Sequence, residues 1–118
     1  MDVKDAVGTR KVFEDENLII WEFELEPGAT TPCHTHQLDY VFYVLDGTRL
    51  EVFDANDQPL GGFDALAGAS FAFHCTNGEL ISSDDKGLRV PATHSARNAG
   101  TTRYREILVE KKRPAVAA

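Results

Sequence analysis

The chain has 118 residues, of which 19 are acidic and 12 basic, and its formal charge at pH 7 is -7. This length fits one domain, and the 42% of hydrophobic residues can form a core, so a wholly disordered chain is excluded. The acidic balance disfavours nucleic acid as a partner, because a negatively charged surface repels phosphates. No apolar stretch reaches the length of about 18 residues that a membrane span needs, and residues 1–5 lack the apolar core of a signal peptide. We therefore expect a cytoplasmic protein with no nucleic-acid or membrane partner.

Apolar residues recur with a period of two, which predicts strands. In residues 21–26, Trp21, Phe23 and Leu25 alternate with glutamates, as in a strand with one buried face. Residues 40–45 are apolar at every position, which predicts a strand covered on both faces. Further strands are expected at residues 48–53, 70–74, 79–82, 88–90, 93–98 and 103–110. Many short strands separated by turns indicate an all-β sandwich or barrel.

We expect a single domain over residues 11–111, with residues 1–10 and 112–118 as flexible ends. No internal repeat or long linker divides the chain. Cys33 and Cys75 are expected to be unpaired, because disulfides are rare in a reducing compartment.

Four histidines, His34, His36, His74 and His94, are the residues that say most about function. His34 and His36 are two positions apart, so on an extended strand their rings project from the same face and can meet one metal ion. Neutral imidazole binds divalent Fe, Ni, Cu and Zn. An exposed or hydrogen-bonded pair has the same spacing, so the surrounding residues decide between the two interpretations.

Those surroundings resemble the first motif of the cupin superfamily, which runs glycine, five residues, His-x-His, three or four residues, glutamate, six residues, glycine. Gly28 lies six residues before His34, and Gly47 follows Tyr40 by seven. Tyr40, four residues after His36, stands at the position of the motif's glutamate. Gly28 and Gly47 can supply turn conformations, Gly47 through a positive φ in a hairpin.

Residues 91–98 are similar to the second cupin motif, in which a proline precedes a histidine and an asparagine follows it. Here these are Pro91, His94 and Asn98, although the motif's usual glycine before the histidine is missing. Asn98 can hold a loop by hydrogen bonds to backbone groups. The resemblance covers about residues 18–110, nearly the whole expected domain.

The resemblance implies an all-β fold, a cupin-type antiparallel β-barrel also described as a double-stranded β-helix or RmlC-like jelly roll. It also implies a divalent metal ion held by His34, His36 and His94. His74 ends an apolar strand and is the alternative ligand if it faces the interior; its other expected role is a hydrogen bond to a backbone carbonyl. Three neutral ligands without a carboxylate resemble the all-histidine cupins, which include cysteine dioxygenases and diketone-cleaving dioxygenases. Iron(II) is the favoured metal, and nickel, manganese and zinc are the alternatives.

The predicted function is that of a mononuclear metal-dependent enzyme, dioxygenase-like, acting on a small chelating organic acid or dicarbonyl compound. Three ligands leave coordination positions open, which a purely structural metal site would not. Tyr40 is the candidate catalytic residue, as a hydrogen-bond donor to the substrate, and its alternative role is packing. The alternative functions are a binding or sensing cupin without turnover and a metal-dependent isomerase or hydrolase. The Asp39-Tyr40 pair and residues 104–110 also resemble small cupins associated with β-alanine degradation.

A homodimer is expected, because residues 40–45 present apolar side chains to both faces and small cupins commonly pair. Cys33 should face away from His34 on a strand, which makes it a poor ligand. Glu106 and Glu110 are expected to be exposed residues of the last strand.

Overall fold

The computed structural model describes residues 7–112, which form eleven strands. The strands are β1 (Arg10–Glu14), β2 (Leu18–Leu25), β3 (His34–Thr35), β4 (Asp39–Asp46), β5 (Thr48–Phe53), β6 (Pro59–Ala65), β7 (Ser70–Thr76), β8 (Glu79–Ser82), β9 (Arg89–Pro91), β10 (Thr93–Asn98) and β11 (Tyr104–Lys111). Within this part of the chain no helix is long and apolar enough to cross a membrane.

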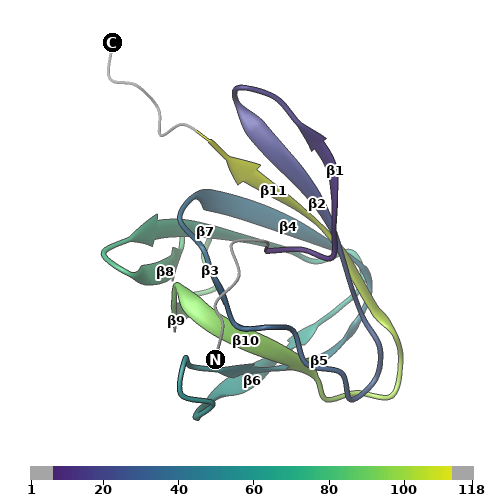
Figure 1. Ribbon diagram of the computed structural model, residues 1–118. Coiled ribbons are helices and arrows are strands. Elements are labelled where there is room, and N and C mark those ends of the chain that lie inside the picture. The colour runs from purple at the N-terminus through teal and green to yellow at the C-terminus, as the bar shows by residue number, and fades with distance from the viewer. Residues whose placement is uncertain (1–6, 113–118) are drawn as a thin grey trace.

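The strands form two antiparallel sheets that lie as two layers (Figure 1). One sheet has seven strands in the order β1-β2-β11-β4-β7-β8-β9, and the other has four in the order β3-β10-β5-β6. Apolar side chains from the facing sides fill the space between the sheets. This arrangement is a double-sheet jelly roll, so the expected all-β fold is confirmed.

Strands β2 and β11 follow the period of two closely. Trp21, Phe23 and Leu25 are buried as predicted. On β11 the buried residues are every second one, and they include Glu106 and Glu110, each only 5% exposed. The prediction that these two glutamates are exposed was therefore wrong. Because β11 is central in its sheet and one of its faces lines the interior, every residue in register with Leu108 points inward.

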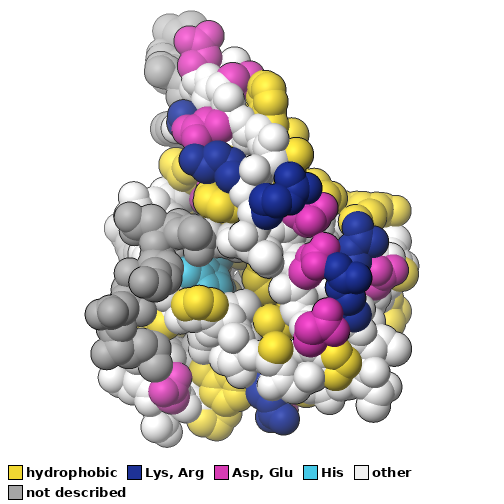
Figure 2. Space-filling model, turned by 45° about the vertical axis from the view of Figure 1, so that its right-hand side comes forward, with side chains coloured by type: hydrophobic (Ala, Val, Ile, Leu, Met, Phe, Trp, Pro, Cys, Tyr) yellow, Lys and Arg dark blue, Asp and Glu magenta, His cyan; other side chains and the backbone are white. Residues whose placement is uncertain are grey.

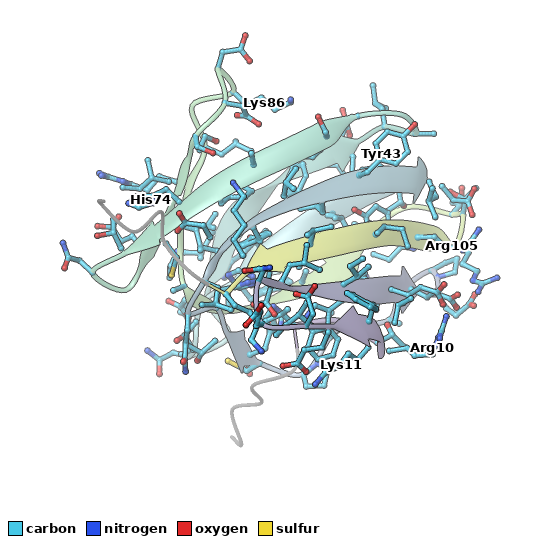
Figure 3. All side chains as sticks on the ribbon, turned by 90° about the horizontal axis from the view of Figure 1, so that it is seen from above. Arg10, Lys11, Tyr43, His74, Lys86 and Arg105 are labelled. Atoms are coloured by element: carbon cyan, nitrogen blue, oxygen red, sulfur yellow. The ribbon has the colours of Figure 1, made fainter. Side chains whose placement is uncertain are left out.

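Strand β4 is covered on one face only. Tyr40, Phe42 and Val44 are buried in the core, whereas Tyr43 is 50% exposed and projects from the outer face of the sheet (Figure 3). The predicted covering of both faces was wrong, because the second sheet packs against the inner face alone. The homodimer, which was inferred partly from this outer face, stays a prediction.

Two glycines and an asparagine shape the crossings between the sheets. Gly28 has a φ of +80° just after β2, as the sequence indicated. Gly47 has no positive φ and makes no hairpin, because β4 and β5 belong to different sheets. It is required for space, since a Cβ there would lie 2.5 Å from the backbone oxygen of Ala65. Asn98 confirms its predicted role by binding three backbone groups and the Thr48 hydroxyl.

The described parts of both ends are held to the sheets. Val7 is 3% exposed, and the Thr9 amide donates to the Glu22 carbonyl. At the other end the amide of Lys112 donates to the Asn17 carbonyl, and its ammonium lies 2.7 Å from Glu14. The remainder of the two predicted flexible ends, residues 1–6 and 113–118, lies outside the described residues.

Acidic and basic side chains lie side by side on the outer surface shown in Figure 2. Arg105, for example, pairs with Glu24 at 3.8 Å and with Asp46 at 3.4 Å, and Arg103 also reaches Glu24. Because such exposed pairs are solvated, they contribute little to the stability of the fold. In these pairs the acidic side chains offset the positive charge of Arg103 and Arg105 locally.

Candidate metal centre

Three histidines meet where β3 pairs with β10. His34 on β3 lies directly opposite His94 on β10, and the amide of His36 donates to the Ala92 carbonyl at 2.9 Å, which holds His36 beside them. All three side chains are buried, and their potential ligand atoms lie within 4.8 Å of one another. Their ring centroids are 4.7 to 5.1 Å apart. The structure thus brings together the three residues that the two motifs single out.

Backbone carbonyls orient two of the three rings. Nδ1 of His34 donates to the Pro32 carbonyl at 2.9 Å, and Nδ1 of His94 donates to the Pro91 carbonyl at 2.7 Å. Because a carbonyl can only accept, each Nδ1 carries the proton and each Nε2 keeps its lone pair. Metal-binding histidines are commonly held in this way by a partner on the second ring nitrogen.

Nδ1 of His36 is the one polar side-chain atom of residues 7–112 that is both completely shielded from solvent and without a hydrogen-bond partner. Such an atom needs an explanation, because buried polar groups are normally hydrogen-bonded. The ring is held instead by stacking on Tyr40, with centroids 4.4 Å apart and planes 15° from parallel. An unpaired imidazole beside two rings with free Nε2 atoms fits a divalent cation.

Burial also sets the protonation state of the cluster. It lowers the pKa of His34, it brings that of His94 to about 4, and together with the two neighbouring rings it holds the pKa of His36 well below its usual range. All three imidazoles are therefore neutral at pH 7. The neutral form is the one that coordinates metals.

His74 lies outside the cluster. Its side chain is 58% exposed, points away from the sheets (Figure 3) and pairs through Nδ1 with Asp39 at 3.0 Å. The neighbouring Phe71 and Phe73 point inward, so His74, one position further along β7, points outward. Asp39 also accepts a hydrogen bond from the Cys75 amide at 2.8 Å. Cys33 and Cys75 are both free thiols, and neither belongs to the metal-binding group found in residues 7–112.

The cluster lies in the wall of a cavity of about 200 Å³. Aromatic and aliphatic side chains make up most of the remaining wall, among them Phe23, Tyr40, Phe42, Phe73, Val90 and Leu108. Burial raises the pKa of Tyr40, and the Glu106 carboxylate raises it further once that group is ionised, so the Tyr40 phenol keeps its proton. Among the described residues, Glu106 is the only one that brings a carboxyl group to this wall. Glu106 was predicted to be an exposed residue, although its place two residues before Leu108 on the same strand indicates an inward orientation.

No protein-family model and no curated protein matches the sequence. Solved structures do match. A cupin domain from Bordetella pertussis Tohama I has a TM-score of 0.64 and 19% identity, over 96% of this chain and 99% of that one. A protein with a double-stranded β-helix domain from Klebsiella pneumoniae has a TM-score of 0.56 and 16% identity, over 98% and 86%. The polyketide cyclase RemF from Streptomyces resistomycificus has a TM-score of 0.54 and 17% identity, over 88% and 63%.

The structure and these likenesses together define a small jelly-roll protein with a buried group of three histidines that could hold a metal ion. Its fold is the cupin fold, as the resemblance of its motifs implied. At sequence identities below 20%, these structural matches establish a shared fold but not a shared activity.

Proposed function

We propose that this protein is a mononuclear metal-dependent enzyme, dioxygenase-like, that acts on a small chelating organic acid or dicarbonyl compound. The observation that carries the proposal is the buried cluster of His34, His36 and His94 in the wall of an apolar cavity. Three protein ligands would leave coordination positions for a substrate and a second reactant. Iron(II) is the proposed metal, with nickel, manganese and zinc as alternatives; when bound, the ion supplies Lewis acidity and, as iron, one-electron chemistry.

The ligand set itself selects for an anion. Three neutral imidazoles leave the full charge of a divalent ion uncompensated, so an enolate or carboxylate is the complementary ligand. The aromatic walls, Phe42 and Phe73 among them, exclude water and strengthen this attraction. The cavity, at about 200 Å³, is smaller than the pockets of roughly 300 to 1,000 Å³ that hold drug-sized ligands. A substrate of metabolite size follows from these dimensions.

Loading the protein separately with iron(II), nickel and zinc tests the proposal. With 2,4-pentanedione and with 2-oxo acids as chelating probes, we expect oxygen uptake matched to loss of the probe for the iron form only. Turnover that continues unchanged without oxygen in the zinc or nickel form contradicts the dioxygenase and supports the isomerase or hydrolase. Binding of the probes with no turnover in any form contradicts an enzyme and supports the sensing module.

Tyr40 is the proposed catalytic hydrogen-bond donor. It stacks on His36 and lines the cavity, so its hydroxyl is available to an oxygen of a substrate held at the histidines. We expect Tyr40→Phe to lower kcat about hundredfold, as for the loss of one well-placed donor, while metal stoichiometry stays unchanged. Steady-state kinetics and metal analysis of the same preparation check this. Turnover within about twofold of the parent protein would show that Tyr40 only packs.

A further inference from the structure

We propose that Glu106 is a second recognition group in the cavity: a neutral carboxylic acid whose Oε2 donates a hydrogen bond to a carbonyl or hydroxyl oxygen at the end of the ligand remote from the histidines. The inference rests on the proposed function in one respect, namely that the histidine centre holds the other end of the same ligand. It names a substrate class, small acids with a second, uncharged oxygen group.

The position of Glu106 is set by the central strand of the larger sheet. On β11 it lies opposite Phe23 of β2 and Val44 of β4, and it faces the cavity from this apolar floor. Glu106 is only 5% exposed, and no Lys or Arg of residues 7–112 forms a salt bridge with it. A carboxylate without a cation in apolar surroundings is strongly disfavoured.

Tyr104 distinguishes the two oxygens of Glu106. Its hydroxyl donates to Oε1 at 2.5 Å, and the tyrosine is itself fully buried with its ring edge-on to Phe23 at 5.8 Å between centroids. Oε1 is thereby the accepting oxygen, and Oε2 makes no hydrogen bond within the described residues. The acid proton therefore belongs on Oε2, where it can be donated to a ligand. Tyr104 is in this sense a positioning residue.

The titratable groups that face Glu106 support its neutral form. Tyr104 on its own strand and Tyr40 on β4 carry no positive charge, and the three histidines of the cavity wall are neutral. Arg89, the one cation among the described residues of the wall, pairs with Glu79 at 3.0 Å and forms no salt bridge with Glu106. Burial raises the pKa of Glu106 to about 8, against the lowering effect of the Tyr104 hydrogen bond. The competing possibility is that the carboxylate ionises to bind an ammonium group of the ligand. The experiments below separate the two.

Infrared difference spectroscopy of the metal-free protein at pH 7 tests the protonation state without any ligand. We expect the C=O stretching band of a carboxylic acid, absent in Glu106→Gln, shifted in Tyr104→Phe because Oε1 loses its donor, and unchanged in the control Glu16→Gln, whose side chain is exposed. If Glu106→Gln removes no such band, the neutral acid is excluded and the inference fails. Because no metal is present, this result is independent of the proposed function.

Calorimetry of the zinc-loaded protein tests recognition, with 4-oxopentanoate and 5-oxohexanoate compared with pentanoate and hexanoate. We expect the oxo acids to bind about tenfold more tightly, the value of one added hydrogen bond. The preference should vanish in Glu106→Leu and persist in Glu106→Gln, whose amide also donates. No preference in the parent protein overturns the inference, as does its loss in Glu106→Gln. Failure of zinc to bind overturns the proposed function instead, and the infrared test still stands.

Discussion

Replacing His94 by alanine is expected to abolish stoichiometric metal binding. Nδ1 of His94 is already committed to the Pro91 carbonyl, so its Nε2 is one of only three imidazole ligands available to the ion. Losing even an outer partner of a metal ligand weakens affinity about 10- to 100-fold, so losing the ligand itself should weaken it by more than about a hundredfold. Elemental analysis after dialysis, together with calorimetric titration of zinc into the metal-free protein, measures the effect.

The matched control is His74→Ala, which removes an exposed histidine that pairs with Asp39 outside the cavity. We expect this variant to bind one ion per chain with the affinity of the parent protein. His34→Ala should behave as His94→Ala does. Equal loss of metal in all three variants would mean that the ion binds elsewhere, and full retention in His94→Ala would show that the buried cluster is not the site.

Asn98→Ala is expected to destabilise the fold by about 3 to 5 kcal/mol. The Asn98 side chain is fully buried and donates to the carbonyls of Leu25 and Thr102 at 2.9 and 2.8 Å. Its Oδ1 accepts from the Thr48 hydroxyl at 2.6 Å and from the Gly100 amide at 3.0 Å. Truncation would leave these four groups without this partner. The midpoint of urea unfolding measures the loss.

Asn56→Ala is the matched control for this change, because Asn56 is exposed in a loop and its side chain makes no hydrogen bond within the described structure. We expect its effect to stay within about 0.5 kcal/mol. Asn98→Asp, which places a carboxylate oxygen against the carbonyls of Leu25 and Thr102 in a buried site, should destabilise the fold at least as much as Asn98→Ala. A stability of Asn98→Ala equal to that of Asn56→Ala would contradict the role assigned to Asn98.

Strands with one clearly buried face were predictable from the sequence, and three of the strands, β5, β8 and β10, have the predicted bounds. Strand β1 was missed because all five of its residues are exposed, so no alternation of buried and exposed positions marks it. The outer face of β4 was wrongly interpreted for a related reason. Apolar residues at every position show that a strand is hydrophobic, whereas the number of sheets that cover it is a tertiary property.

The candidate site was predictable where a local motif carried it. His34, His36 and His94 stood in recognisable sequence surroundings, and the pairing of β3 with β10 brings them together. Glu106 belonged to no motif. Its orientation depends on the position of β11 between β2 and β4 in the sheet. These strand pairings join residues that are far apart in the chain. The one sequence signal for its inward orientation was that Glu106 lies an even number of positions from the apolar Leu108 on the same strand.

The shortness of β3 links occupancy of the site to local order. This strand has two residues, forms the edge of the smaller sheet and pairs only with β10, through Thr35 opposite Thr93 and His34 opposite His94. So few ladder contacts hold an edge weakly, and such edges open first in native-state fluctuations. An ion bound by histidines of both strands would connect β3 to β10 and hold this edge in place. Metal bound by the three histidines would therefore link β3 to β10, and we expect the metal-free protein to differ from the loaded one in the local motions of β3 rather than in its fold.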